Sequence, residues 1–186
     1  MLELRPGDIV AEKGKGINAW FNRKVFVPHT DRLHFFLIDS FIEDDNDYSI
    51  LESIGKGIAI GRLSWYKLED LEIYRLNDPE CEEIGRKAVA ALSKHGRARY
   101  DYFLLIRFFL SALRLILTLK FPPWKPSQLA YVRDTHLLCV EAVDEAYRAV
   151  NKPIIRESVF PAPAMFKEAL ADGRLVMIFK GTLETV

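Results

Sequence analysis

Cys139 lies near the start of Asp134–Asn151, a segment whose spacing of apolar residues predicts an amphipathic helix. Asp134 or Thr135 is suited to cap this helix, because a side-chain oxygen can accept an unpaired N–H of the first turn. We expect the apolar face to contain Cys139, Ala142, Val143, Ala146, Tyr147 and Val150. The solvent face then holds Glu141, Asp144, Glu145 and Arg148. The helix dipole favours a thiolate at this end, so Cys139 is a candidate nucleophile, with a small buried core residue as the alternative.

The second cysteine, Cys81, also opens a predicted helix, which follows the pair Asp78-Pro79 and continues to about Gly96. Asp78 is a suitable N-cap there, and proline fits the first helical position. Three carboxylates crowd this cysteine, namely Glu80, Glu82 and Glu83. Because nearby carboxylates disfavour a thiolate, we predict that Cys81 is structural.

His34 is the polar exception in Arg32–Ile42, the most strand-like run of the chain. Apolar residues on both faces of this run predict a central strand that is covered on both sides. A buried imidazole needs a hydrogen-bond partner, because an unpaired polar group costs about 1–3 kcal/mol. His34 is therefore either a satisfied core residue or a catalytic one.

Metal and cofactor motifs are not recognisable in the chain. The acidic turn Glu43–Asp47 lacks the glycine and the later glutamate of a calcium loop. Gly14-Lys15-Gly16 does not have a phosphate-binding spacing and is interpreted as a turn. We therefore expect neither a metal nor a cofactor.

The remaining elements predict an α+β fold. Short strands joined by tight turns favour an antiparallel meander that curls towards a barrel. Glu52 shares one face of its strand with Ile50, while Leu51 lies on the other face. A short helix and a final strand close the chain. The predicted strands are 9–11, 32–42, 48–53, 58–60, 71–76 and 175–179, and the last helix is 163–170.

Composition indicates one globular domain over residues 1–186, with 49% apolar and 28% charged residues. The 26 basic and 26 acidic residues balance, so nothing favours a nucleic-acid partner. Two cysteines cannot form a disulfide framework, and free thiols suit a reducing compartment. We see no signal peptide at the N-terminus and expect a cytoplasmic protein.

The segment Phe103–Leu119 is unusually apolar and approaches the length of a membrane span. Arg107 and Arg114 interrupt it, and an arginine at the bilayer centre costs about 2.5–3.5 kcal/mol, which disfavours spanning. Packing against the core or a partner subunit is one interpretation. Contact with a membrane surface or an acyl chain is the other.

The order of these features resembles the circularly permuted branch of the NlpC-type papain-like cysteine hydrolases, which includes YiiX-like proteins and the related lecithin–retinol acyltransferases. The resemblance spans nearly the whole chain. The matching strings are L-R-P-G-D-I-V, L-H-F-F-L-I with His34, I-L-E-S-I-G-K-G-I-A-I with Glu52, R-L-S-W-Y, R-Y-D with Tyr100, H-L-L-C-V-E-A-V-D-E-A-Y with Cys139, and F-P-A-P-A-M-F.

The resemblance implies a circularly permuted papain-like fold, in which an antiparallel sheet or half-barrel packs on helices and the cysteine begins a late helix. It also implies a thiol hydrolase, an amidase or peptidase working through an acyl-thioester. Cys139 would attack the carbonyl, His34 would transfer the proton, and Glu52 would orient the imidazole. The backbone N–H of Cys139 would stabilise the oxyanion.

Two further residues are candidates for the substrate cleft. Tyr100 belongs to the matching string R-Y-D. His136 lies three residues before Cys139, one turn away on the predicted helix, and is either a second polar group of the cleft or a partly exposed first-turn residue. The family usually has small residues where Phe35 and Phe36 follow His34, and often a serine where Val140 follows Cys139. We expect tight packing or a narrowed groove beside the site.

Three functions remain open from the sequence. A hydrolase would act on a peptide or a similar amide, such as the peptides of cell walls. A lipid-directed acyltransferase or thioesterase would act on acyl chains, which the apolar segment Phe103–Leu119 favours. A binding module would have kept the fold and lost the chemistry.

Overall fold

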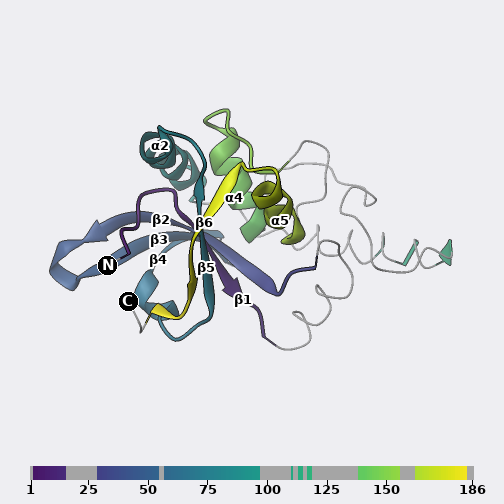
Figure 1. Ribbon diagram of the computed structural model, residues 1–186, viewed down its shortest axis with the longest axis horizontal. Helices are drawn as coiled ribbons and strands as arrows, with labels where there is room; N and C mark the ends of the chain where they lie inside the picture. Colours follow the sequence, from purple (N-terminus) through teal and green to yellow (C-terminus); the bar gives the residue numbers. More distant parts are fainter. Residues whose placement is uncertain are drawn as a thin grey trace.

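The computed structural model describes residues 2–15, 29–54, 57–96, 110, 113–114, 117–118, 138–155 and 162–183. These residues form an α+β fold of six strands and three α-helices, with two short 3-10 helices (Figure 1). The strands are β1 (Ile9–Lys13), β2 (Arg32–Ile42), β3 (Asp47–Ile54), β4 (Gly57–Arg62), β5 (Leu71–Leu76) and β6 (Leu175–Gly181). The helices are η1 (Glu43–Asp45), η2 (Leu63–Tyr66), α2 (Cys81–Ser93), α4 (Cys139–Arg148) and α5 (Ala164–Ala171).

The strands pair in one sheet of order β4-β3-β2-β1-β5-β6, and each of these strands runs antiparallel to its neighbours. Strands β1 to β4 form an antiparallel meander, which confirms the predicted succession of 32–42, 48–53 and 58–60. The predicted continuation from 58–60 to 71–76 is wrong, because β5 pairs with β1 on the other side of the sheet. Within the described part of the chain the sheet is open, with β4 and β6 as its edges. These strands therefore do not close into a barrel.

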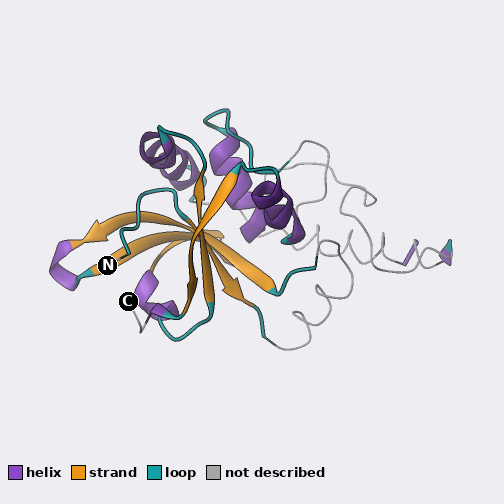
Figure 2. Ribbon diagram, in the orientation of Figure 1, coloured by secondary structure: helices purple, strands orange, loops and turns teal. Residues whose placement is uncertain are grey.

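Helices α2, α4 and α5 lie on the same side of the sheet (Figure 2). Successive side chains of β2 point to opposite faces of the sheet, and Phe35 and Leu37 enter the core that is shared with the helices. Phe36 and Ile38 enter a second core on the opposite face, which also takes Leu63 from η2. The prediction that β2 is a central strand buried on both faces is thus confirmed.

The turn before β1 fixes two helices relative to the sheet. Gly7 has a φ of +86°, a conformation that favours glycine. A Cβ on Gly85 of α2 would lie only 2.0 Å from the carbonyl oxygen of Pro6, so this helix packs directly on the turn. The hydroxyl of Tyr147 on α4 donates a hydrogen bond to the carbonyl of Gly7. Helix α4, which carries Cys139, is held in place by this contact.

The predicted solvent face of the cysteine helix is wrong for two residues. Glu141 and Asp144 are 1% and 0% exposed. The Glu141 carboxylate accepts the N–H of Leu138, at 3.3 Å. Asp144 accepts the N–H of Ile155, at 2.6 Å, and pairs with Arg148 on its own helix. These acids are buried because they satisfy backbone donors of the helix start and of a following loop, which periodicity does not reveal.

Both predicted helix starts also need correction. The residue that precedes α4 is Leu138, which is extended with φ −74° and ψ 162°, so neither Asp134 nor Thr135 is the N-cap. Cys139 is consequently the first residue of the helix. Helix α2 begins at Cys81, and Asp78 accepts the N–H of Glu80 just before it.

Candidate active site

A histidine–glutamate pair joins two neighbouring strands of the sheet. Phe36 on β2 lies opposite Glu52 on β3, which places His34 diagonally across from the glutamate on the same face. The Nε2 of His34 and the Oε2 of Glu52 are 2.8 Å apart. Since a carboxylate can only accept, Nε2 carries the proton of this bond, and Nδ1 is the nitrogen left to exchange a proton with another group.

Cys139 reaches this pair from the first turn of α4. Its thiol is half-buried and donates a hydrogen bond to the carbonyl of Leu33, at 3.5 Å. A hydrogen bond with Cys139 also contributes to the environment of His34. The structure therefore brings together the three predicted catalytic residues, Cys139, His34 and Glu52, which come from α4, β2 and β3.

The charges of this cluster stabilise one another. Burial lowers the pKa of His34, but hydrogen bonds and attraction to Cys139 and Glu52 outweigh it and raise the pKa from 6.5 to about 10. Burial raises the pKa of Glu52, but hydrogen bonds from His34 and Tyr66 hold it below its usual value. At neutral pH the cluster therefore favours a charged imidazolium at His34 beside the ionised carboxylate of Glu52.

The helix start adds a second source of positive potential. As the first helical residue, Cys139 has an N–H with no acceptor inside the helix. This N–H and the partial positive charge of the helix end can stabilise an oxyanion formed beside the sulfur. The burial of Glu141 at the same turn keeps the helix start fixed through Leu138.

Tyr66 is a further member of the site, to which sequence reasoning assigned no role. It ends η2, and its hydroxyl donates to the Oε2 of Glu52, at 2.8 Å. Its ring lies 6.1 Å from the imidazole of His34 and 4.6 Å from the ring of Phe36. Tyr66 is the last residue of the string R-L-S-W-Y. Because a buried carboxylate needs more than one hydrogen-bond donor, Glu52 could have been expected to bind a second donor such as this tyrosine.

A second carboxylate, Glu12 on β1, lies opposite His34 in the strand register. It is half-buried, and burial is the main cause that raises its pKa, while attraction to His34 opposes this. Among the described residues no hydrogen-bond donor to its carboxylate is found. His34 is thus flanked by two glutamates that differ in how their charge is satisfied.

The two phenylalanines after His34 are packed tightly, as expected. Phe35 and Phe36 are 1% and 0% exposed, on opposite faces of the sheet. Phe35 stacks on Phe166 of α5, with the ring centroids 4.2 Å apart. Val140 is also buried. These larger side chains fill the two cores beside the site.

Several predicted features lie outside the described residues. These are Tyr100, His136 and most of Phe103–Leu119. In the part of the chain that is described, no group of three His, Cys, Asp or Glu side chains is placed to hold a metal ion. The described helices include none with the length and apolar character needed to cross a membrane. Cys81 and Cys139 are both free, as the sequence predicts.

Comparison with known proteins does not identify a family. No family model matches the chain, and no curated protein sequence matches it.

Proposed function

We propose that this protein is a thiol hydrolase of the amidase or peptidase type, with Cys139 as nucleophile, His34 as general acid and base, and Glu52 as the residue that orients the imidazole. The observation that most supports this proposal is the hydrogen-bonded His34–Glu52 pair, which lies beside a cysteine that is the first residue of a helix. The order of these residues, with the histidine strand before the cysteine helix, supports a circularly permuted papain-like fold.

The first half of the reaction forms a thioester. The Sγ of Cys139 attacks the carbonyl carbon of an amide, and the carbonyl oxygen becomes an oxyanion that accepts the Cys139 N–H. The intermediate collapses as the carbon–nitrogen bond breaks. Nδ1 of the His34 imidazolium gives its proton to the leaving amine, which departs neutral.

The second half releases the acid. Water attacks the thioester carbonyl while the neutral imidazole of His34 takes one of its protons. The carbon–sulfur bond then breaks, the carboxylic acid product leaves, and the thiolate–imidazolium pair is restored. Glu52 remains ionised throughout and holds Nε2, so that the same ring nitrogen faces the sulfur in both steps.

Thiol reactivity tests this proposal directly. The rate of Cys139 alkylation by iodoacetamide is measured from pH 4 to pH 9, in a Cys81→Ser background that removes the other thiol. We expect rapid alkylation at pH 6, and a rate about tenfold lower in the His34→Ala variant, because an unassisted thiol is largely protonated at that pH. If alkylation is slow in both proteins and has the same pH profile, the catalytic proposal is wrong and a binding module is favoured.

A lipid-directed acyltransferase or thioesterase is the second candidate. The observation that favours it is the exposure of Leu110, Leu113 and Leu117, which are 61%, 52% and 75% exposed in the apolar segment Phe103–Leu119. Such side chains suit contact with acyl chains or a membrane surface. Hydrolysis of a short p-nitrophenyl ester is compared with and without phospholipid vesicles. Stimulation that is lost in Leu113→Asp favours the lipid substrate, and equal rates favour the amide hydrolase.

A further inference from the structure

The Glu52 carboxylate is held by two donors at the same oxygen. Oε2 accepts a hydrogen bond from Nε2 of His34 and another from the hydroxyl of Tyr66, both at 2.8 Å. The ring of Tyr66 also stacks beside the imidazole, with the two centroids 6.1 Å apart and the planes inclined by 29°. One side chain thus lies beside both the base and the residue that orients it.

The competing carboxylate explains why this contact matters. Glu12 lies opposite His34 on β1, and its charge is also attracted by the imidazolium. Burial raises the pKa of both glutamates. Only Glu52 accepts a hydrogen bond from the Tyr66 hydroxyl, which opposes this rise. A fixed second donor makes Glu52 the preferred anionic partner and prevents the imidazole from turning towards Glu12.

Among the residues that the structure describes, the other ionisable groups around the pair are few. From α4 comes Cys139, and from β1 comes Glu12. Next to Glu12 lies the ion pair of Lys15 and Glu69, whose atoms are 2.6 Å apart and whose opposite charges largely cancel. Neither of these last two residues contributes to the environment of Tyr66, which responds to Glu52 and Glu12.

We propose that Tyr66 is a positioning residue of the active site, which holds the Glu52 carboxylate through its hydroxyl and the imidazole of His34 through its ring. The inference rests on the proposed function of Cys139 and His34. It assigns η2 a role in catalysis, because this short helix supplies the contact that decides which carboxylate serves the histidine.

The test compares two tyrosine-to-phenylalanine variants in the Cys81→Ser background. Tyr66→Phe removes the hydroxyl and keeps the ring that packs on Phe36. Tyr48→Phe is the matched control, because Tyr48 packs against the same core and its ring contacts Phe41, away from the pair. Alkylation of Cys139 by iodoacetamide is followed from pH 4 to pH 9, and thermal unfolding of each variant is recorded.

In Tyr66→Phe we expect the acid limb of the alkylation profile to move upward by about one pH unit, with a rate at pH 5 about three- to tenfold lower than in the parent. The direction follows because loss of the hydroxyl raises the pKa of Glu52, so that its charge is lost at a higher pH. Tyr48→Phe should keep the parental profile. A structural role alone would lower the unfolding temperature of Tyr66→Phe and leave the limb in place.

The two possible failures are distinguishable. If His34→Ala slows alkylation but Tyr66→Phe matches Tyr48→Phe at every pH, the inference about Tyr66 is overturned and the proposed function stands. If His34→Ala has no effect either, the proposed function itself fails.

Discussion

Two buried charge clusters on β2 are built from the same kinds of group and have different uses. In each, a glutamate accepts a hydrogen bond from a tyrosine hydroxyl and pairs with a basic side chain of β2. The His34 cluster consists of His34, Glu52 and Tyr66. The Arg32 cluster consists of Arg32, Glu72 and Tyr74, and the Arg32 guanidinium and the Glu72 carboxylate are 3.0 Å apart.

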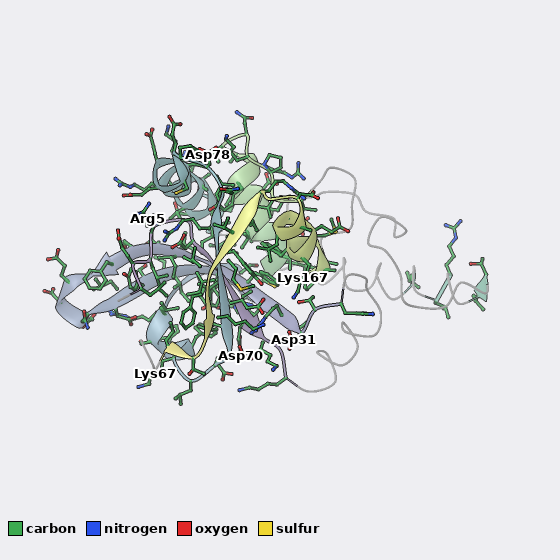
Figure 3. All side chains as sticks on the ribbon, viewed as in Figure 1. Arg5, Asp31, Lys67, Asp70, Asp78 and Lys167 are labelled. Carbon is green, nitrogen blue, oxygen red and sulfur yellow. The ribbon has the colours of Figure 1, made fainter. Side chains whose placement is uncertain are left out.

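The two clusters differ in exposure and in their neighbours. The side chain of Arg32 is 3% exposed, whereas that of His34 is 24% exposed. Arg32 also bonds to Asp70, which lies close to Asp31 (Figure 3). Its guanidinium stays charged at any pH the protein survives, so Arg32 cannot act as an acid or a base. His34 can, and the thiol of Cys139 lies beside it. The same arrangement is therefore structural where it is sealed, and suited to catalysis where it is open and titratable.

The largest effect that separates the clusters is on stability. Arg32→Met removes the buried guanidinium that pairs with Glu72 and leaves this carboxylate with Tyr74 and the exposed Lys180, so we expect the free energy of unfolding to fall by about 3 kcal/mol. His34→Met should cost about 1 kcal/mol, because the site is partly exposed and Tyr66 still holds Glu52. Urea unfolding at pH 7 measures both. Equal losses would show that the His34 cluster is as structural as the Arg32 cluster.

The dependence of stability on pH should have opposite signs in the two clusters. Burial raises the pKa of Glu72, but hydrogen bonds from Tyr74, Arg32 and Lys180 lower it from 4.5 to about 2. Its stabilisation, at most about 3 kcal/mol, is thus present above pH 4.5 and lost as the pH falls through about 2. The pKa of His34 is raised from 6.5 to about 10, so its contribution is complete below pH 6.5 and lost as the pH rises through about 10.

Unfolding experiments on single variants can show which residue causes the loss of stability at low pH and which causes the loss at high pH. Glu72→Gln should flatten the loss of stability between pH 4.5 and pH 2 and leave the alkaline limb unchanged. His34→Ala should flatten the decline between pH 6.5 and pH 10 and leave the acid limb unchanged. A variant that flattens the wrong limb would contradict the comparison.

Periodicity predicted much of what positions the His34 cluster. The apolar run of β2 predicted a central strand, which the structure confirms. The spacing along the cysteine helix correctly predicted its apolar face, where Ala142 and Ala146 are each 1% exposed. These features depend on local spacing, which the sequence contains directly. The partnership of His34 and Glu52 was instead implied by the family resemblance, and the two side chains are 2.8 Å apart in the structure.

The parts that were not predicted depend on pairing between distant segments. Glu72 forms an ion pair with Arg32 only because β5 pairs with β1, and no local sequence pattern indicates this pairing. Tyr66 reaches Glu52 through the course of η2 after β4. Asp144 was assigned to solvent because the loop that covers it contributes a backbone donor, the N–H of Ile155. Polar groups that satisfy one another across such distances are invisible to hydrophobic periodicity.

The smallest expected effect tests how closely the His34 cluster is packed. A Cβ added at Gly61 on β4 would lie 2.9 Å from Oε1 of Glu52 and 3.1 Å from Trp65, so the carboxylate must shift by a few tenths of an ångström. In the Cys81→Ser background we expect Gly61→Ala to slow Cys139 alkylation at pH 5 by about two- to threefold, because a displaced Glu52 holds the imidazolium less firmly. The matched control is Gly96→Ala, whose Cβ would meet only the carbonyl of Ser93, at 3.4 Å. If both variants alkylate at the parental rate, Glu52 tolerates displacement, and its oxygens need not be fixed as closely as those of Glu72 in the sealed cluster.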